Sequence, residues 1–134
     1  QGCEIIGCTR LKEMYSIDRA ATEDDWSTEY LDKKITVKIV DNIEESVEHI
    51  NKYSSGHTES CLSDNQESIQ YFFQNCKSAI LMNNASTQFA DGGEFGFGAE
   101  IGISTDKLHV RGPVGAKHLT TFKYQVTGNH TTRP

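Results

Sequence analysis

The centre of the chain alternates between short apolar runs and amphipathic stretches. Residues 35–40 alternate β-branched and polar positions before an apolar end, which predicts a strand. Apolar residues then recur at helical spacing over residues 43–50, directly after the capping pair at 41–42. A helix that ends near Tyr53 should therefore follow the strand.

The same alternation is repeated once. A short strand is expected over residues 59–62, and Ser63 stands at capping-box spacing from Gln66, which marks the start of a second helix. The apolar run at residues 79–82 predicts a buried strand. Four residues at helical spacing form the apolar face of the second helix: Ile69, Phe72, Phe73 and Cys76.

This order of elements predicts the α/β fold class. Strand, helix, strand, helix and strand in succession favour parallel strands with right-handed crossovers, here a βαβαβ sheet layer that unites residues 35–40, 59–62 and 79–82. Ligands of such sheets usually bind beyond the carboxyl ends of the strands. Residues 83–95 are therefore the first candidate for a site region.

The two ends of the chain are harder to interpret. Residues 4–6 suggest a strand, and residues 11–25 suggest a loop or an irregular helix. Residues 119–126 alternate apolar and polar positions, which predicts a strand that pairs with a sheet edge of the same or another subunit. The polar residues 128–134 should be loosely held.

Composition excludes several classes of function. The chain has 134 residues, which suits one domain, and a net charge of −6. Its 13 basic residues are scattered, which argues against nucleic acid as a partner. No apolar run is long enough to span a bilayer, and no secretory signal opens the chain, so neither a membrane nor an extracellular role is expected.

The four cysteines favour reduced thiols in a cytoplasmic protein. Their spacing matches no zinc site, and Cys61 and Cys76 fall on positions expected to be buried. Cys61 has no neighbouring cation that would favour a thiolate, so it is a poor nucleophile candidate. No serine or cysteine triad is evident, and no metal site is expected.

Two features leave alternatives open. The spaced glycines of residues 93–98 match neither a P-loop nor a dinucleotide fingerprint, so a structural loop is favoured over a phosphate cradle. His49 is expected at the surface or boundary of its helix. His57 precedes a strand, where contact with a substrate and a hydrogen bond to the backbone are equally plausible.

Several long stretches carry a family resemblance. Residues 21–32, 47–59 and 84–105, continued by residues 109–113 and 119–121, resemble the gamma-glutamyl phosphate reductase family. The second stretch is similar to its signature helix and turn, and the third to its glycine-rich segment. The resemblance runs without interruption from about residue 21 to residue 128.

The resemblance implies an aldehyde-dehydrogenase-like fold and an oxidoreductase of proline biosynthesis. Members reduce L-glutamyl 5-phosphate with NADPH to L-glutamate 5-semialdehyde and phosphate, through a cysteine thioester. The nucleophilic cysteine and the dinucleotide-binding domain lie upstream of the matched region in the family. Residues 1–118 would thus be the C-terminal half of the catalytic domain, and residues 119–134 the oligomerisation strand and tail of a cytoplasmic homo-oligomer. A chain that starts at Gln1 without methionine suits a processed or excised piece.

The resemblance also assigns roles to residues. Glu29 is similar to the carboxylate that binds the nicotinamide ribose, and Ser86 and Thr87 to residues at the substrate mouth. Phe95 would form a wall of the acyl pocket, and no catalytic residue is expected in this chain. Gln88 replaces an arginine of the family, which removes a bidentate partner for carboxylate or phosphate.

A second hypothesis has the same fold and a different function. The chain would be a non-catalytic folded module that oligomerises and binds a gamma-glutamyl kinase. The two hypotheses differ in whether the parent protein supplies the cysteine and the dinucleotide domain. The isolated chain should be inactive in either case.

Overall fold

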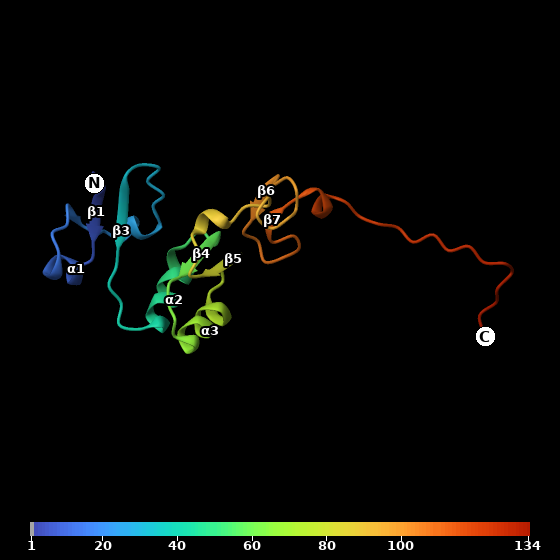
Figure 1. Cartoon of the computed structure of the whole chain (residues 1–134), viewed down its shortest axis with the longest axis horizontal. Helices are drawn as coiled ribbons and strands as arrows, with labels where there is room; N and C mark the ends of the chain where they lie inside the picture. Colours follow the sequence, from blue (N-terminus) through green and yellow to red (C-terminus); the bar gives the residue numbers. More distant parts are fainter. Residues whose placement is uncertain (1) are drawn as a thin grey trace.

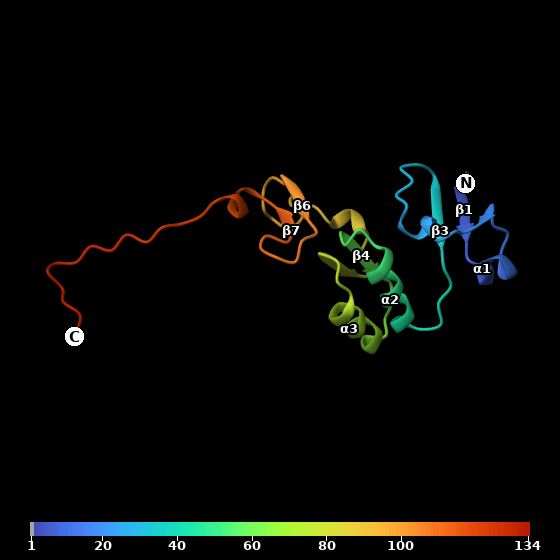
Figure 2. The ribbon, with the colours of Figure 1, turned by 180° about the vertical axis from the view of Figure 1, so that it is seen from behind.

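The computed structural model describes residues 2–134 and is elongated. An N-terminal sheet, a pair of strands with two helices, a small antiparallel pair and an extended tail follow one another along its axis (Figure 1), and Figure 2 gives the view from behind. The strands are β1 (Glu4–Gly7), β2 (Arg19–Ala20), β3 (Lys34–Val37), β4 (Thr58–Cys61), β5 (Ile80–Asn83), β6 (Gly102–Ser104) and β7 (Gly112–Val114). The α-helices are α1 (Thr9–Met14), α2 (Ile43–Tyr53) and α3 (Gln66–Asn75), and the 3-10 helices are η1 (Asp24–Ser27), η2 (Thr87–Phe89) and η3 (Ala116–Leu119).

The N-terminal sheet has the strand order β2-β1-β3, and both strand pairs are parallel. Ile6 of β1 is fully buried, so the expected strand near the N-terminus is confirmed and forms the centre of the sheet. At Gly7 a Cβ atom would lie 2.7 Å from Leu11 Cδ2. Glycine at this position therefore lets α1 pack directly against the end of β1.

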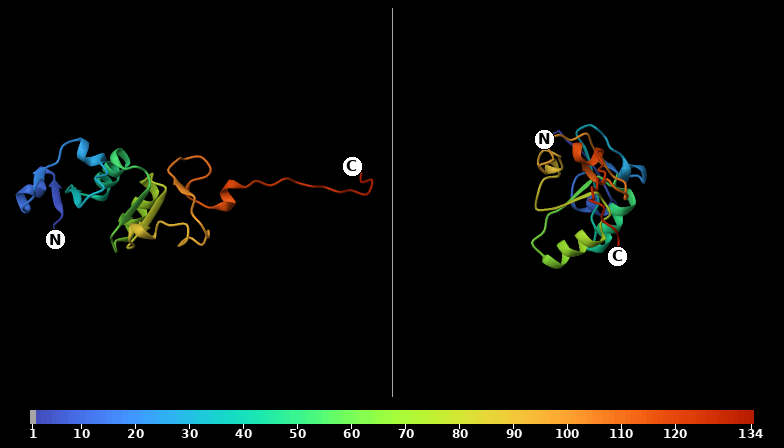
Figure 3. Two further views of the ribbon diagram at one scale, coloured as in Figure 1. Left: turned by 90° about the horizontal axis from the view of Figure 1, so that it is seen from above. Right: turned by 90° about the vertical axis from the view of Figure 1, so that its right-hand side faces the viewer.

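The middle of the molecule is a parallel strand pair covered by two helices. β4 and β5 are in register from Thr58 opposite Ile80 onward. α2 and α3 pack against each other and against this pair (Figure 3). The buried core consists of Val47, Phe72 and Cys76, with partly buried residues of both helices and both strands around it. Phe73, expected on the same face, is 44% exposed.

The helix boundaries show one cap as expected and one that differs. α2 is capped by Asn42, whose Oδ1 accepts from the Glu45 amide at 2.8 Å. α3 is capped by Asn65, which accepts from the Ser68 amide, and not by Ser63. The Ser63 hydroxyl instead accepts from the Asn65 amide in the preceding turn, so it is unavailable to the helix.

The expected α/β architecture with parallel strands is confirmed, but a single sheet through residues 35–40, 59–62 and 79–82 is wrong. β3 pairs with β1, whereas β4 and β5 form a separate sheet. The segment Glu4–Gly7 offers β3 a parallel partner, which sequence periodicity could not reveal. The expected continuation of the strand also stops at Val37, because the Ile39 amide points to Cys8 Sγ at 3.4 Å instead of a neighbouring strand.

The C-terminal part consists of the antiparallel pair β6–β7, the short η3 and a tail. Leu119 ends η3, and residues 120–126 are irregular, so the strand expected over 119–126 is not present within residues 2–134, where the segment has no partner. Phe122, Tyr124 and Val126 are exposed by 76%, 85% and 93%. Pairing of this segment with another subunit stays a prediction. No helix within residues 2–134 has the length and apolar character needed to cross a membrane.

Candidate active site groove

A groove of about 730 Å³ lies where the loop after β2, the end of α2 and the residue after β6 meet. Glu29, the predicted ribose-binding residue, is one of its lining residues. Hydroxyl and aromatic side chains form most of the remaining surface: Trp26, Ser27, Thr28, Tyr53, Ser54, Ser55, His57 and Thr105. This composition suits a polar ligand with a planar ring system.

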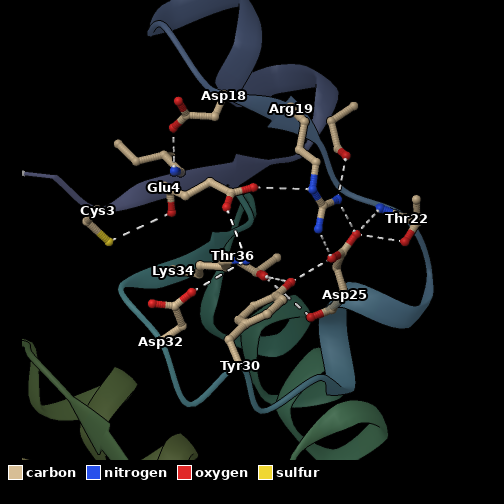
Figure 4. A network of polar contacts seen from close by, with 12 residues as sticks. Cys3, Glu4, Asp18, Arg19, Thr22, Asp25, Tyr30, Asp32, Lys34 and Thr36 are labelled. Atoms are coloured by element: carbon tan, nitrogen blue, oxygen red, sulfur yellow. Dashed lines mark hydrogen bonds and ion pairs between the residues drawn. The ribbon is translucent and has the colours of Figure 1, made fainter.

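The loop that carries Glu29 is held by the buried carboxylate of Asp25 (Figure 4). The Arg19 guanidinium donates to both carboxylate oxygens, at 2.7 and 2.5 Å. The amide and hydroxyl of Thr22 each donate at 2.7 Å, and the Tyr30 hydroxyl donates at 2.6 Å. Asp25 thereby ties together both ends of the loop around Glu29.

The electrostatics of this cluster follow from its hydrogen bonds. Arg19, then Tyr30 and Thr22, hold the pKa of Asp25 well below its usual range. The pKa of Arg19 is raised, chiefly by the same carboxylate. The Tyr30 hydroxyl also lies 2.9 Å from Thr36 Oγ1 on β3, which anchors the loop to the sheet. The position of Glu29 is therefore set by a permanently charged pair next to it.

A second clamp joins this loop to α2. The Tyr53 hydroxyl donates to Glu23 Oε1 at 2.6 Å, and Lys52 Nζ lies 3.0 Å from the same oxygen. The Tyr53 hydroxyl and then Lys52 lower the pKa of Glu23. The His49 ring lies near both Trp26 and Tyr53, with ring centroids 5.2 and 4.7 Å away. Burial is the main cause that lowers the pKa of His49.

The turn before β4 forms the facing wall of the groove. Gly56 has a φ of +76°, a backbone conformation that favours glycine, and its amide donates to Ser54 Oγ at 2.9 Å. The carbonyls of Gly56 and His57 accept from the amides of Ala79 and Ile80 at 2.8 and 3.0 Å. The turn is thus fixed to β5 by its backbone.

The predicted substrate residues Ser86 and Thr87 face a different cavity. They line a groove of about 480 Å³ with Ser60, Leu62 and Asn84, at the carboxyl ends of β4 and β5. Ser86 Oγ accepts from the Gln88 amide at 3.2 Å and so caps η2. This location agrees with the end of the strands where a ligand was expected.

Phe95 faces a third cavity, of about 530 Å³ and mainly apolar. Ile80, Met82, Phe97 and Pro113 are among the residues that surround it. Glu29, the pair Ser86 and Thr87, and Phe95 therefore line three cavities, of which the last two adjoin at Ala85, and no one cavity contains all of these residues. Their roles stay predictions.

The glycine-rich segment closes on itself. The Gly92 amide donates to Glu100 Oε2 at 2.7 Å, and a Cβ atom on Gly92 would lie 3.0 Å from Glu100 Cβ. The Phe97 amide also donates to the Gly92 carbonyl. A carboxylate of the chain itself thus occupies the amide next to the glycine motif of residues 93–98 and ties the loop to residue 100. Within residues 2–134, no histidine, cysteine, aspartate and glutamate side chains gather as a metal site would require.

Local sequence pattern gives no role to most residues in and around the groove, among them Asp25, Trp26 and Thr105. Asp25 and Trp26 lie inside a stretch that carries the resemblance, so their position was noticed without a role. Thr105 follows β6 and reaches the groove only through the fold. Nothing in local periodicity connects residue 105 with residue 29.

Comparisons with known proteins identify the family. No protein-family model matches the chain. A gamma-glutamyl phosphate reductase of Brucella suis is 54% identical over 132 residues, which cover 98% of this chain and 31% of the relative. The reductase of Bartonella henselae is 52% identical over 134 residues, covering all of this chain and 32% of the relative.

Solved structures agree with the sequence matches. The crystal structure of gamma-glutamyl phosphate reductase from Thermotoga maritima superposes with a TM-score of 0.90 at 50% identity, covering 99% of this chain and 32% of that chain. The yeast reductase gives a TM-score of 0.50 at 30% identity, over 71% of this chain and 25% of that one. The chain spans about a third of the length of the curated relatives it matches. Over nearly its whole length the chain is similar to a C-terminal part of gamma-glutamyl phosphate reductases, and it shares their aldehyde-dehydrogenase-like fold.

Proposed function

We propose that this chain is part of a reductase that converts L-glutamyl 5-phosphate to L-glutamate 5-semialdehyde and phosphate in proline biosynthesis. The proposal rests on identity of 52–54% over nearly the whole chain to proteins named gamma-glutamyl phosphate reductase. NADPH is the proposed cofactor, and it supplies the hydride when bound. Glu29 is the residue of this chain that would bind it.

The surroundings of Glu29 support the proposed binding of a dinucleotide. The Glu29 side chain is exposed, lines the groove and makes no hydrogen bond within residues 2–134. A carboxylate can accept from two adjacent hydroxyls at once, as a ribose 2′,3′-diol presents them. The Asp25 cluster and the Glu23 clamp hold the loop in place before any ligand arrives, which lowers the cost of ordering on binding.

The nucleophilic thiolate is assigned to another part of the parent polypeptide. Cys76 is buried, and none of the cysteines lines the Glu29 groove. Cys8 is partly desolvated, which raises its thiol pKa, but amide donors led by Ile39 outweigh this and lower it. Since Cys8 lies outside the groove, this shift does not make it the acyl acceptor.

Quaternary state and location complete the proposal. The exposed apolar side chains at 122, 124 and 126 favour a homo-oligomer formed through residues 119–126. Four free thiols suit the reducing cytoplasm. Binding of a gamma-glutamyl kinase stays a prediction, since no surface of the described residues is specific for it.

Assays of the full-length parent test the proposal. The purified protein should reduce NADP with L-glutamate 5-semialdehyde and inorganic phosphate, followed by NADPH absorbance. The isolated chain should show no turnover. A variant with Cys3, Cys8, Cys61 and Cys76 all replaced by alanine should retain activity if it folds, and Cys8→Ser alone should do so as well. A full-length wild-type protein without turnover would contradict the proposal.

A further inference from the structure

Several polar groups in the Glu29 groove have no partner within residues 2–134. On one wall these are the Glu29 carboxylate and the indole N–H of Trp26. On the facing wall they are the hydroxyls of Ser55 and Thr105 and Nε2 of His57. The hydroxyls of Thr28, Tyr53 and Ser54, by contrast, all donate to oxygen atoms of the protein. The groups without partners are therefore the ones available to a ligand.

His57 is held rigidly and is half-buried. Its carbonyl accepts from the Ile80 amide at 3.0 Å, and its Nδ1 lies 2.6 Å from Thr58 Oγ1. Because Thr58 occupies one ring nitrogen, Nε2 is the nitrogen that remains for a ligand. An imidazole that is already held through Nδ1, on an anchored backbone, loses less freedom when it binds.

The facing wall has the chemistry of an anion site without a strong cation. Ser55 and Thr105 can each donate one O–H, and the imidazole donates from Nε2 in the tautomer in which its Nδ1 accepts from the Thr58 hydroxyl. Within residues 2–134 no lysine or arginine lines this groove, so hydroxyl and imidazole groups are the donors that it offers to an anion. The wall with Glu29 would instead repel an anion and accept from hydroxyls. A ligand with a diol at one end and a phosphate at the other matches both walls.

We propose that His57 Nε2, with the hydroxyls of Ser55 and Thr105, binds a phosphate oxygen of the ligand in this groove. The inference rests on the proposed function, since it takes the ligand from that reaction. The phosphate has two possible sources, the dinucleotide and the acyl phosphate substrate. Both present anionic oxygens to hydrogen-bond donors, and kinetic constants separate them.

The test compares His57→Leu and His57→Gln in the full-length reductase, with His130→Gln in the exposed tail as the matched control. His57→Leu should weaken binding and raise one Kd or KM value about tenfold or more. This is the loss expected when one hydrogen bond to an anionic oxygen is removed. His57→Gln keeps a hydrogen-bond donor and should therefore lose less affinity than His57→Leu. Unfolding midpoints of all variants in urea show whether the fold is intact.

The two sources give different results. A dinucleotide phosphate predicts a higher Kd for NADP, by calorimetry, and a higher KM for NADPH. An acyl phosphate predicts a higher KM for L-glutamyl 5-phosphate and weaker binding of inorganic phosphate, with an unchanged Kd for NADP. If folded His57→Leu binds NADP and inorganic phosphate as the wild type does, with unchanged KM values, the inference is wrong.

Failure of the proposed function looks different. A wild-type protein that turns over no semialdehyde contradicts the reductase assignment itself. The binding constants for NADP and inorganic phosphate still decide the role of His57 in that case. Loss of NADP binding by His57→Leu would then support a phosphate site at His57, even though the protein does not catalyse the reductase reaction.

Discussion

Asp25 and Glu29 lie four positions apart on one loop, and the structure uses their carboxylates in opposite ways. Asp25 is buried and accepts from Arg19, Thr22 and Tyr30. Glu29 is exposed and has no partner within residues 2–134. At the scale of single residues, the sequence resemblance pointed to Glu29 but gave no role to Asp25. The reason is physical, since Arg19, Thr22 and Tyr30 come close to Asp25 only in the folded loop.

Asp25→Asn should lower stability at neutral pH, because it removes the carboxylate that Arg19 holds at 2.5 Å and leaves the guanidinium only the more distant Glu4, at 3.5 Å. The pKa of Asp25 is depressed in the folded state, so its contribution is complete above the unfolded value of about 3.9 and is lost as pH falls. Urea unfolding at pH 7 should show a lower midpoint for the variant, and the difference from the wild type should shrink toward pH 3. Equal midpoints at pH 7 would show that the cluster does not hold the loop.

His49 should titrate below its ordinary pKa of about 6.5, because burial first and then Lys38 disfavour its charged form. The associated stability is present above the unfolded value and declines as pH falls through it. Trp26 is the only tryptophan and lies 5.2 Å from the imidazole, so its fluorescence should report protonation of His49. The fluorescence titration of the wild type should have a midpoint below 6.5 and be absent in His49→Gln. A midpoint above 6.5 would contradict this.

At the scale of elements, local pattern specified helices better than strand partners. The spacing of apolar residues and the Asn42 cap placed α2 correctly at Ile43–Tyr53. The partner of β3 could not be predicted, because Glu4–Gly7 is distant in sequence and its pairing is a tertiary property. Likewise, Ser63 stands at capping-box spacing, yet Asn65 caps α3. The Ser63 hydroxyl accepts from the Asn65 amide in the turn before the helix, and Asn65 Oδ1 accepts from the Ser68 amide.

The two phenylalanines of α3 should differ in their contribution to stability. Phe72 is 1% exposed in the core, whereas Phe73 is 44% exposed. Phe72→Ala should cost about 3–5 kcal/mol of unfolding free energy through lost burial and the cavity left behind. Phe73→Ala is the matched control and should cost clearly less. Urea unfolding of both variants checks this, and equal losses would show that sequence spacing described the buried face better than the structure does.

At the scale of the molecule, several parts of the chain are uncovered within residues 2–134. The sheet of β4 and β5 has only two strands, and the tail over 119–126 has no partner within residues 2–134. The predicted site residues face three cavities. The division at residue 118 and the roles of Glu29, of Ser86 with Thr87 and of Phe95 stay predictions.

The tail should mediate self-association through its apolar face. Replacing Phe122, Tyr124 and Val126 by serine should shift the sedimentation of the full-length protein toward monomer, because the apolar contacts of a paired strand are lost. Serine at Thr121 and Lys123, on the other face, is the control and should leave assembly unchanged. A wild-type protein that is monomeric at high concentration would exclude this role.

The most direct measurement of the whole account is the binding of NADPH by the full-length reductase with Glu29→Gln. Glu48→Gln on the exposed side of α2 provides a control of equal charge change, since Glu48 lines none of the three cavities. Loss of a carboxylate that accepts from ribose hydroxyls should raise the KM for NADPH about tenfold or more. The control should stay near the wild-type value. An unchanged KM for NADPH in a folded, active Glu29→Gln enzyme would contradict the assignment of this groove to the cofactor.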